Sequence, residues 1–279
     1  MVKLPYPMRN EPHKILQSSF RELLSLSMRF GEKLKDKYVW SKEDIDEAHG
    51  FLLYFRNNLE KQRQKEIFGE GGDFFGLEPF KRGYNTKSVL FKTLVQQEEK
   101  KWVLKIGHRI SPVVDYGDPS THAYFLQHKQ HLEILRKHVL KNPMLRYLVP
   151  EPQEIIWATV KKVEKTLQTT LALQPYIHII KAEKIKDVVS EDQKKILLAE
   201  FQEFKKLCDV FMKNHKLRPD LLGEGNLEIA RIGYAYHVVL LDMGLVDLEA
   251  PIPITQTVMY FAALQTLYKW ETMLKELPE

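Results

Sequence analysis

Apolar residues at helical spacing dominate the first 60 residues of the chain. The first stripe comprises Ile15, Leu16, Phe20, Leu23, Leu24, Leu26 and Phe30. Because these residues recur within a polar background, they predict an amphipathic helix. A second helix is predicted from Ser41, which has the spacing of a capping box with Asp44. Both stripes need burial, so we expect the helices of the first 70 residues to pack on the rest of the protein.

Glycines 69, 71, 72 and 76 interrupt the helical pattern and predict a helix end or a linker. After them, short β-type runs predict strands over 87–95, 101–106, 154–163, 169–173 and 238–241. Helices are predicted from about 120 to 140, from 190 to about 214 with Gln193 as capping-box partner of Ser190, and from about 255 onward. A small antiparallel sheet with one inserted helix, followed by a mainly helical half, is an α+β pattern.

Composition narrows the class of protein. With 44% hydrophobic and 28% charged residues, the chain can bury a core, so disorder is excluded for most of its length. The formal net charge of +5 is too small and too dispersed to indicate a nucleic-acid binder. A single cysteine, Cys208, excludes an intramolecular disulfide and any metal site built from cysteines.

The first ten residues carry prolines and charges where a signal peptide needs an apolar core. No apolar run approaches the roughly 20 residues of a membrane span. We therefore expect a cytoplasmic protein with no membrane association.

One lysine, Lys105, lies inside the apolar run WVLKIG. Burying an ammonium group costs several kcal/mol unless an anion meets it, so a lysine in this position usually has a partner or extends to the surface. Because Lys105 alternates with Val103, it could also lie on the solvated face of a half-buried strand. The pattern leaves both interpretations open.

Three oxygen-bearing side chains follow in the C-terminal half. Asp220 and Asn226 lie in a segment rich in glycine and proline, and Asp242 follows the apolar run VVLL. Oxygen ligands of this kind are what a magnesium–phosphate complex requires. Each motif alone is equally typical of a surface turn.

Taken in order, these pieces resemble the protein-kinase-like fold, including its relatives that phosphorylate small molecules. Lys105 in VLKIG matches the strand lysine that holds the α- and β-phosphates of ATP. Gly83 lies where the family has its glycine-rich hairpin. Asp220 and Asn226 resemble the catalytic aspartate and the metal-binding asparagine of the family's catalytic loop, with one extra residue between them. The tripeptide beginning at Asp242 resembles the metal-binding Asp-Phe-Gly.

The segment LALQPY, residues 171–176, resembles the hinge that binds adenine through its backbone. With Leu173 as the gatekeeper, the resemblance implies that the Gln174 carbonyl and the Tyr176 N–H contact adenine. Pro175 then lies between these two residues, at a position whose N–H would not contact adenine, so the lack of an N–H in proline is tolerated there.

The family also pairs the strand lysine with a glutamate of the inserted helix. Glu133 is the only acid between Ser120 and Asn142, which makes it the candidate partner of Lys105. On a helical wheel, however, Glu133 lies away from the apolar face, and the family's spacing selects His131 instead. The ion pair is therefore either absent or remodelled.

The resemblance implies three parts: an N-terminal helical extension over 1–70, a small-sheet lobe over 71–178 and a reduced helical lobe over 179–279. ATP and Mg2+ would lie between the lobes, with Asn226 and Asp242 as metal ligands and Asp220 as the catalytic residue acting on the hydroxyl of an unknown acceptor. The chain ends soon after Gly244, which leaves no room for the helices that dock a protein substrate and favours a small-molecule or atypical acceptor.

Two departures from the family keep other classes open. The glycine-rich hairpin retains only Gly83, where the family usually has three glycines. In the catalytic loop, Arg218-Pro219 replaces the family's His-Arg. One alternative is a pseudokinase that binds nucleotide without transferring phosphate. The other is a structural or interaction subunit with a protein partner and no nucleotide.

Overall fold

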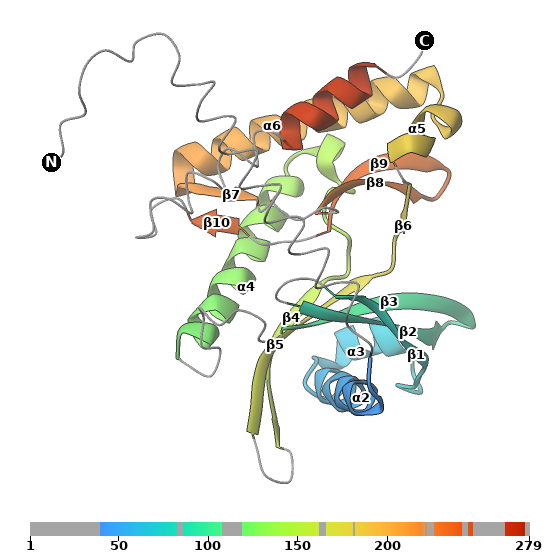
Figure 1. The fold of residues 1–279 in the computed structure, drawn as a ribbon, viewed down its shortest axis with the longest axis vertical. Helices are drawn as coiled ribbons and strands as arrows, with labels where there is room; N and C mark the ends of the chain where they lie inside the picture. Colours follow the sequence, from blue (N-terminus) through green and yellow to red (C-terminus); the bar gives the residue numbers. More distant parts are fainter. Residues whose placement is uncertain are drawn as a thin grey trace, which may run out of the picture.

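A five-stranded antiparallel sheet forms the centre of the first half of the protein (Figure 1). Its strands are β1 (Phe74–Arg82), β2 (Thr86–Val95), β3 (Glu98–Gly107), β4 (Glu154–Lys161) and β5 (Thr166–Pro175). Their spatial order is β1-β2-β3-β5-β4, which makes β3 the central strand. Helix α4 (Pro119–Val139) lies in the connection between β3 and β4. The mixed α+β class expected from the sequence is confirmed.

This computed structural model describes residues 40–82, 86–107, 119–161, 166–180, 182–219, 221, 226–241, 245–247 and 266–276. The helix predicted over residues 15–30 and the site residues Gly83, Asp220 and Asp242 lie outside these ranges. No helix in the described ranges combines the length and apolar character that a membrane span requires.

Helices α2 (Lys42–Asn57) and α3 (Lys61–Phe68) cover one face of the sheet (Figure 1). The predicted capping box is present, because the Asp44 N–H donates to the Ser41 hydroxyl and the Ser41 N–H donates to the Asp44 carboxylate. The apolar side of both helices packs on alternate residues of the central strands in one cluster, which we call the sheet cluster. Its members include Phe51, Phe55, Phe68, Val89, Phe91, Leu104 and Leu173. The prediction that these helices pack on the protein is confirmed for residues 40–70.

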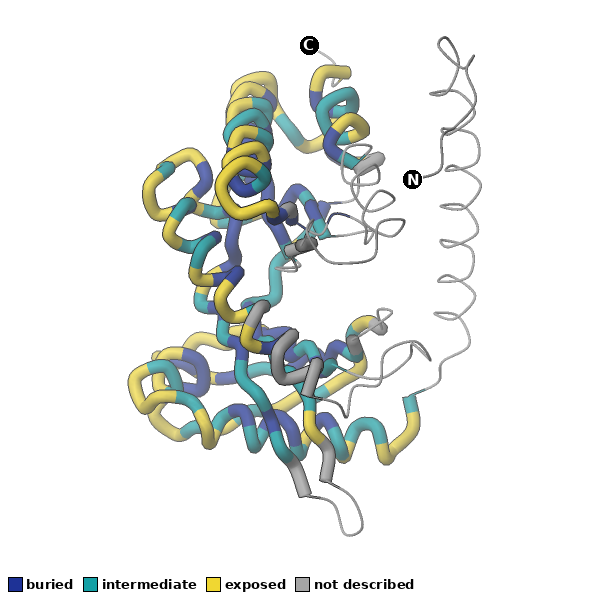
Figure 2. Tube along the Cα trace, turned by 90° about the vertical axis from the view of Figure 1, so that its left-hand side faces the viewer, coloured by how far each residue is buried: buried dark blue, intermediate teal, exposed yellow. Residues whose placement is uncertain are grey.

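Helix α4 packs on the opposite face of the sheet. Leu132 and Leu135 of α4 share a cluster with Ile155 of β4, and Ala172 of β5 packs against the same cluster. This second cluster, the helical cluster, continues into the C-terminal half through Phe201 and Phe204. Figure 2 shows buried residues along the strands and on the inward side of the helices, with exposed residues on their outward turns.

The second half combines helices with two small sheets. Its elements are β6 (His178–Ile179), α5 (Ala182–Val188), α6 (Glu191–His215), β7 (Leu217–Pro219), β8 (Leu227–Ile232), β9 (Ala235–Leu240) and β10 (Leu245–Asp247). One sheet has the order β6-β8-β9 and the other pairs β10 with β7. Residues 266–275 form a last helix, whose Leu267 and Leu274 belong to the helical cluster.

Polar contacts attach the long helix α6 to strand β9. The buried Glu200 carboxylate lies 2.6 Å from His237 Nδ1 and accepts the Val238 N–H at 2.9 Å. Ser190 caps α6 as predicted, because its hydroxyl accepts the Gln193 N–H. The Gln193 side chain instead exchanges hydrogen bonds with the backbone of Tyr236, so it anchors β9 in place of completing the predicted capping box.

Candidate functional site

Lys105 joins the five-stranded sheet to the C-terminal half. It lies on the central strand β3, directly opposite Ser88 of β2 and Ala172 of β5. The side chain is half-buried, and its Nζ donates a hydrogen bond to the backbone carbonyl of Leu241 at 2.6 Å. Of the two interpretations of Lys105 left open by the sequence, the one in which the ammonium has a partner is correct.

Leu241 immediately precedes Asp242, and its backbone is fixed from two sides. Its carbonyl accepts the Lys105 ammonium, and its N–H donates to the Asn226 carbonyl at 2.7 Å. Asn226 is half-buried and directly precedes β8. The backbones of Asn226 and Leu241 are therefore adjacent, so two of the predicted site segments begin or end beside Lys105.

A second link connects the same two segments at their other ends. Strand β7 pairs with β10, with Pro219 opposite Leu245. Asp220 and Asp242 lie outside the described residues, but Asp220 follows Pro219 directly and Asp242 follows Leu241. The segment that runs from 219 to 226 and the segment that runs from 241 to 245 are thus joined at both of their ends. Lys105 is bonded to the second segment, at Leu241.

The register of β5 against β3 determines which hinge residues share the face of Lys105. Directly opposed residues of neighbouring strands point to the same face, and successive residues alternate. Gln174 is opposite Val103 and therefore shares the face of Lys105. Leu173 is opposite Leu104 and belongs to the sheet cluster beneath α2 and α3. Leu173 therefore lies on the sheet face opposite to that of Lys105, and Gln174 lies on the same face as Lys105.

The same register moves the expected backbone contacts by one residue. The Tyr176 N–H donates to the Lys101 carbonyl at 2.8 Å, so it is engaged with β3. In an antiparallel ladder, hydrogen-bonded residues alternate with residues whose backbone groups point the other way. Gln174 consequently bonds to β3 as Tyr176 does, whereas the Pro175 carbonyl and the Ile177 N–H point away from β3. These two groups replace the Gln174 carbonyl and the Tyr176 N–H as the candidate hinge contacts.

Helix α4 directs His131 toward the protein interior, whereas Glu133, the only acidic residue of the helix, is exposed. His131 is buried beside Leu132. Since the buried side of α4 packs on the sheet face that carries Lys105, the exposed Glu133 points away from that face. The structure does not bring Glu133 to Lys105. The helical-wheel argument, which placed Glu133 off the apolar face, explains this outcome.

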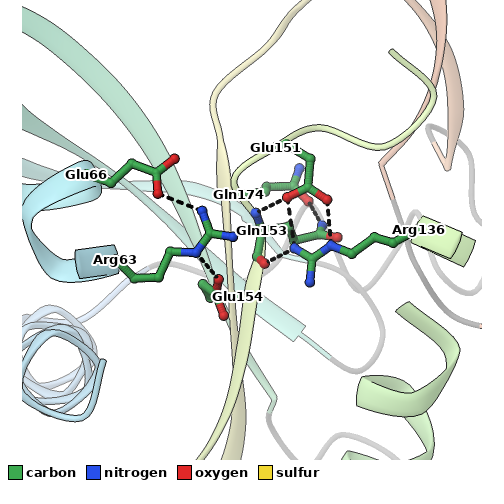
Figure 3. A network of polar contacts seen from close by, with 7 residues as sticks. All are labelled: Arg63, Glu66, Arg136, Glu151, Gln153, Glu154 and Gln174. Carbon is green, nitrogen blue, oxygen red and sulfur yellow. Dashed lines mark hydrogen bonds and ion pairs between the residues drawn. The ribbon is translucent and has the colours of Figure 1, made fainter. Parts of the chain in front are cut away.

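A network of polar side chains connects α4 with the segment before β4 and with the end of β5 (Figure 3). Arg136 of α4 binds both carboxylate oxygens of Glu151 and also donates to the Gln153 carbonyl. The Gln153 N–H donates to Glu151 at 2.9 Å, and its side-chain amide donates to Gln174 Oε1 at 3.2 Å. This network could not be predicted from the sequence, because nothing in the spacing of these residues shows that they meet.

A second part of the network ties α3 to β4. Arg63 binds Glu66 at 2.6 Å and Glu154 at 3.0 Å (Figure 3). The hydrogen bond that Arg63 donates to the Glu66 carboxylate is the main reason that the pKa of Arg63 is raised. Burial raises the pKa of Glu154, although the positive charge of Arg63 opposes this effect. The Arg63–Glu154 pair therefore holds α3 against β4.

Of the two predicted magnesium ligands, Asn226 lies within the described residues. Within the described residues there is no group of three or more histidine, cysteine, aspartate or glutamate side chains that could hold a metal ion. Asn226 is the described member of the predicted ligand pair, and its backbone is bonded to the residue before Asp242. An amide and a carboxylate from these two positions have the oxygen chemistry that Mg2+ prefers.

Comparison with known families and with curated proteins finds no family model and no curated protein that matches this chain.

Proposed function

We propose that the protein is an ATP- and Mg2+-dependent phosphotransferase of the kinase-like fold, which acts on a small-molecule or atypical hydroxyl acceptor. The observation that carries the proposal is the 2.6 Å hydrogen bond from Lys105 Nζ to the carbonyl of Leu241. This contact joins the strand lysine to the residue before Asp242, 136 positions further along the chain. The resemblance requires that proximity, and neither segment predicts it alone.

Topology supports the same proposal. An antiparallel sheet with one helix inserted between β3 and β4 agrees with the small-sheet lobe that the resemblance implies. The extended segment after β5 leads into the helical half, as a hinge between lobes over 71–178 and 179–279 would. The hydrogen bond between Leu241 and Asn226 and the pairing of β7 with β10 support a catalytic loop adjacent to the segment of Asp242.

In this proposal each residue has a separate task. The Lys105 ammonium would neutralise the α- and β-phosphates, and the backbone of Gly83 would approach them. Asn226 and Asp242 would hold Mg2+, which supplies charge neutralisation to the phosphates when bound. The Pro175 carbonyl and the Ile177 N–H would contact adenine. Asp220 would accept or orient the proton of the acceptor hydroxyl, so that catalysis is positioning together with charge stabilisation.

A pseudokinase is the alternative that a specific observation favours. In the resembled family an acid of the inserted helix holds the strand lysine in place, and here Glu133 is exposed. If no other group takes over that role, nucleotide would bind without efficient transfer of phosphate. Nucleotide binding and phosphate transfer therefore need separate measurements.

Binding is tested by thermal denaturation of the full chain with Mg-ATP. A ligand at 100 times its dissociation constant stabilises a protein by about 2.7 kcal/mol, which raises the melting temperature measurably. We expect this rise in the wild type and its loss in Lys105→Met. The control Lys100→Met changes an exposed lysine of the same strand and should retain the rise. If millimolar Mg-ATP leaves the wild type unchanged, both nucleotide-dependent functions are wrong and a structural or interaction subunit takes their place.

Transfer is tested by release of phosphate from ATP with and without candidate hydroxyl acceptors. Asp242→Asn should abolish turnover, because it removes the charge that would hold Mg2+. Asp220→Asn should lower turnover while the affinity for ATP is nearly retained, because Asp220 would act on the acceptor. A wild type that binds Mg-ATP but is no faster than these two variants would establish the pseudokinase.

A further inference from the structure

Strand β9 is held along its outer edge by side chains of helix α6. In the sheet order β6-β8-β9, β9 pairs with β8 on one side and with no described strand on the other. The N–H of Tyr236 donates to Gln193 Oε1 at 3.1 Å, and the N–H of Val238 donates to Glu200 Oε2 at 2.9 Å. An edge strand normally presents such groups to solvent or to another strand. Here two side chains of α6 take the place of that strand.

Glu200 is the buried and charged member of this attachment. Its exposed fraction is 5%, and its second oxygen lies 2.6 Å from Nδ1 of His237, which is 7% exposed. An ionised carboxylate can only accept hydrogen bonds, so this contact assigns a proton to His237 Nδ1. A buried charged pair is often no more stabilising than apolar residues of the same volume, so stability alone explains it poorly. Fixing the position of a backbone segment explains it better.

The hydrogen-bonded pair β8-β9 leads to both proposed metal ligands at the same end. Leu227 of β8 lies directly opposite Leu240 of β9. Asn226 immediately precedes Leu227, and Asp242 follows Leu240 by two residues. The ladder between the two strands sets the spacing of the segments that carry the ligands. The place of the pair in the helical half depends on contacts with other elements, and those to α6 hold β9 directly.

Helix α6 also leads to the proposed catalytic residue. Through Lys216 it continues into β7, which ends immediately before Asp220. Glu200 therefore links the helix that leads to Asp220 with the strand that leads to Asp242.

We propose that Glu200 is a positioning residue for the magnesium site, an inference that rests on the proposed function. By accepting the Val238 N–H, its carboxylate holds β9 where Asn226 and Asp242 can bind Mg2+ together with ATP. Without this attachment, the β8-β9 ladder persists but its ends are no longer fixed relative to α6. Lys105 lies on the other half of the protein and still binds the phosphates. Loss of Glu200 should therefore weaken the contribution of Mg2+ to nucleotide binding and not the binding of ATP alone.

The test is titration calorimetry of ATP on the full chain, with Mg2+ and with EDTA. We expect the wild type to bind ATP more tightly with Mg2+. Glu200→Gln has nearly the same volume, but its amide offers one oxygen to two donors, His237 Nδ1–H and the Val238 N–H. In this variant the gain in affinity from Mg2+ should fall about fivefold or more, the effect of one lost hydrogen bond, while the affinity in EDTA is unchanged.

Glu203→Gln is the matched control, because it makes the same change one turn further along α6. The Glu203 carboxylate binds Asn142 and Lys206, so the variant also loses structural contacts. It should nevertheless retain the wild-type gain from Mg2+. Gln193→Leu breaks the attachment at Tyr236 without removing a buried charge, and it should show the same selective loss as Glu200→Gln. This variant decides the question if Glu200→Gln does not fold.

Two results would overturn the role of Glu200 while the proposed function stands. One is a folded Glu200→Gln that retains the wild-type gain from Mg2+. The other is an equal loss of affinity with Mg2+ and with EDTA, which would show a purely structural role. If the wild type binds no ATP, or gains nothing from Mg2+, both the role of Glu200 and the proposed function are wrong.

Discussion

Individual residues of the candidate site are positioned by backbone groups as much as by side chains. The Lys105 ammonium bonds to a main-chain carbonyl, and the hinge residues are distinguished by which backbone groups point away from β3. A change of one residue in register exchanges the two faces of a strand. That is why the sequence motif, which could not show the register of β5, named Leu173 and Tyr176 where the register places Gln174 on the face of Lys105 and engages the Tyr176 N–H with β3.

One residue away from the site, His138, allows a prediction about pH. Its ring lies 5.1 Å from that of Phe211 and 6.2 Å from that of His215. Burial lowers the pKa of His138 below its ordinary 6.5, and the positive charges of His215 and Lys141 lower it further. As pH falls through 6.5, the unfolded chain therefore takes up a proton before the folded chain does, and stability decreases.

We expect the melting temperature of the wild type to fall between pH 7.5 and pH 5.5, and His138→Gln to reduce that fall. Differential scanning calorimetry at the two pH values measures both. His178→Gln replaces an exposed histidine and serves as the control. An equal fall in wild type and His138→Gln would show that protonation of His138 does not oppose folding.

At the scale of elements, periodicity was sufficient where a segment is long and amphipathic. Helices α2, α4 and α6 and strands β2 to β5 were predicted close to their observed bounds. Strand β1 was not predicted, because the glycines up to Gly76 indicate a helix end or a linker, whereas in the structure Gly76 lies in an irregular edge strand with two register shifts. Helix α3 and strand β8 were also not predicted. Helix α3 is only eight residues long, and β8 forms by pairing with β6 and β9, which no local pattern shows.

The end of α3 gives a prediction at this scale. Gly69 follows the helix with a φ of +72°, and an added Cβ would collide with the carbonyl oxygen of Leu94 on β2. Both the positive φ and the backbone contact oppose any larger residue, so Gly69→Ala should destabilise the protein by about 2 kcal/mol or more. Urea denaturation followed by circular dichroism measures the change.

Gly50 provides the matched control, because it lies inside α2 with nothing within 4 Å of an added Cβ. Gly50→Ala should stabilise the protein by about 0.5–1 kcal/mol, since alanine favours a helix interior over glycine. If Gly69→Ala unfolds at the same urea concentration as Gly50→Ala, the close approach of α3 to β2 is wrong.

The whole molecule shows why the candidate site could be predicted only in outline. Motif order selected Lys105 and Asn226, and the structure connects both to Leu241. The polar network around Gln153 and the exposure of Glu133 depend on how α4 packs against β4 and β5, which requires the tertiary structure. The predicted packing of the N-terminal helices follows directly from their apolar stripes, because such a stripe must be buried whatever surface covers it.

This packing predicts how strongly α2 contributes to the stability of the whole protein. Phe55 of α2 is fully buried in the sheet cluster with Leu104 and Leu173. Leu173 belongs to β5, whose adjacent residue Ala172 packs against the helical cluster on the opposite face. Because the same strand contributes to both clusters, loss of packing on one side should weaken the other.

Phe55→Ala should therefore lower the free energy of unfolding by about 3–5 kcal/mol. The variant should still unfold in a single cooperative transition, at a lower urea concentration, and not in two separate transitions. Urea denaturation followed by far-UV circular dichroism and by tryptophan fluorescence measures this, with coincident curves expected. Phe75→Ala, at a β1 residue that is 45% exposed, should change stability by less than about 1 kcal/mol. If Phe55→Ala is no less stable than Phe75→Ala, α2 is not part of the folded unit. If instead the two probes separate into two transitions, the sheet cluster and the helical cluster fold independently, and the Lys105–Leu241 contact joins two units that are each stable without the other.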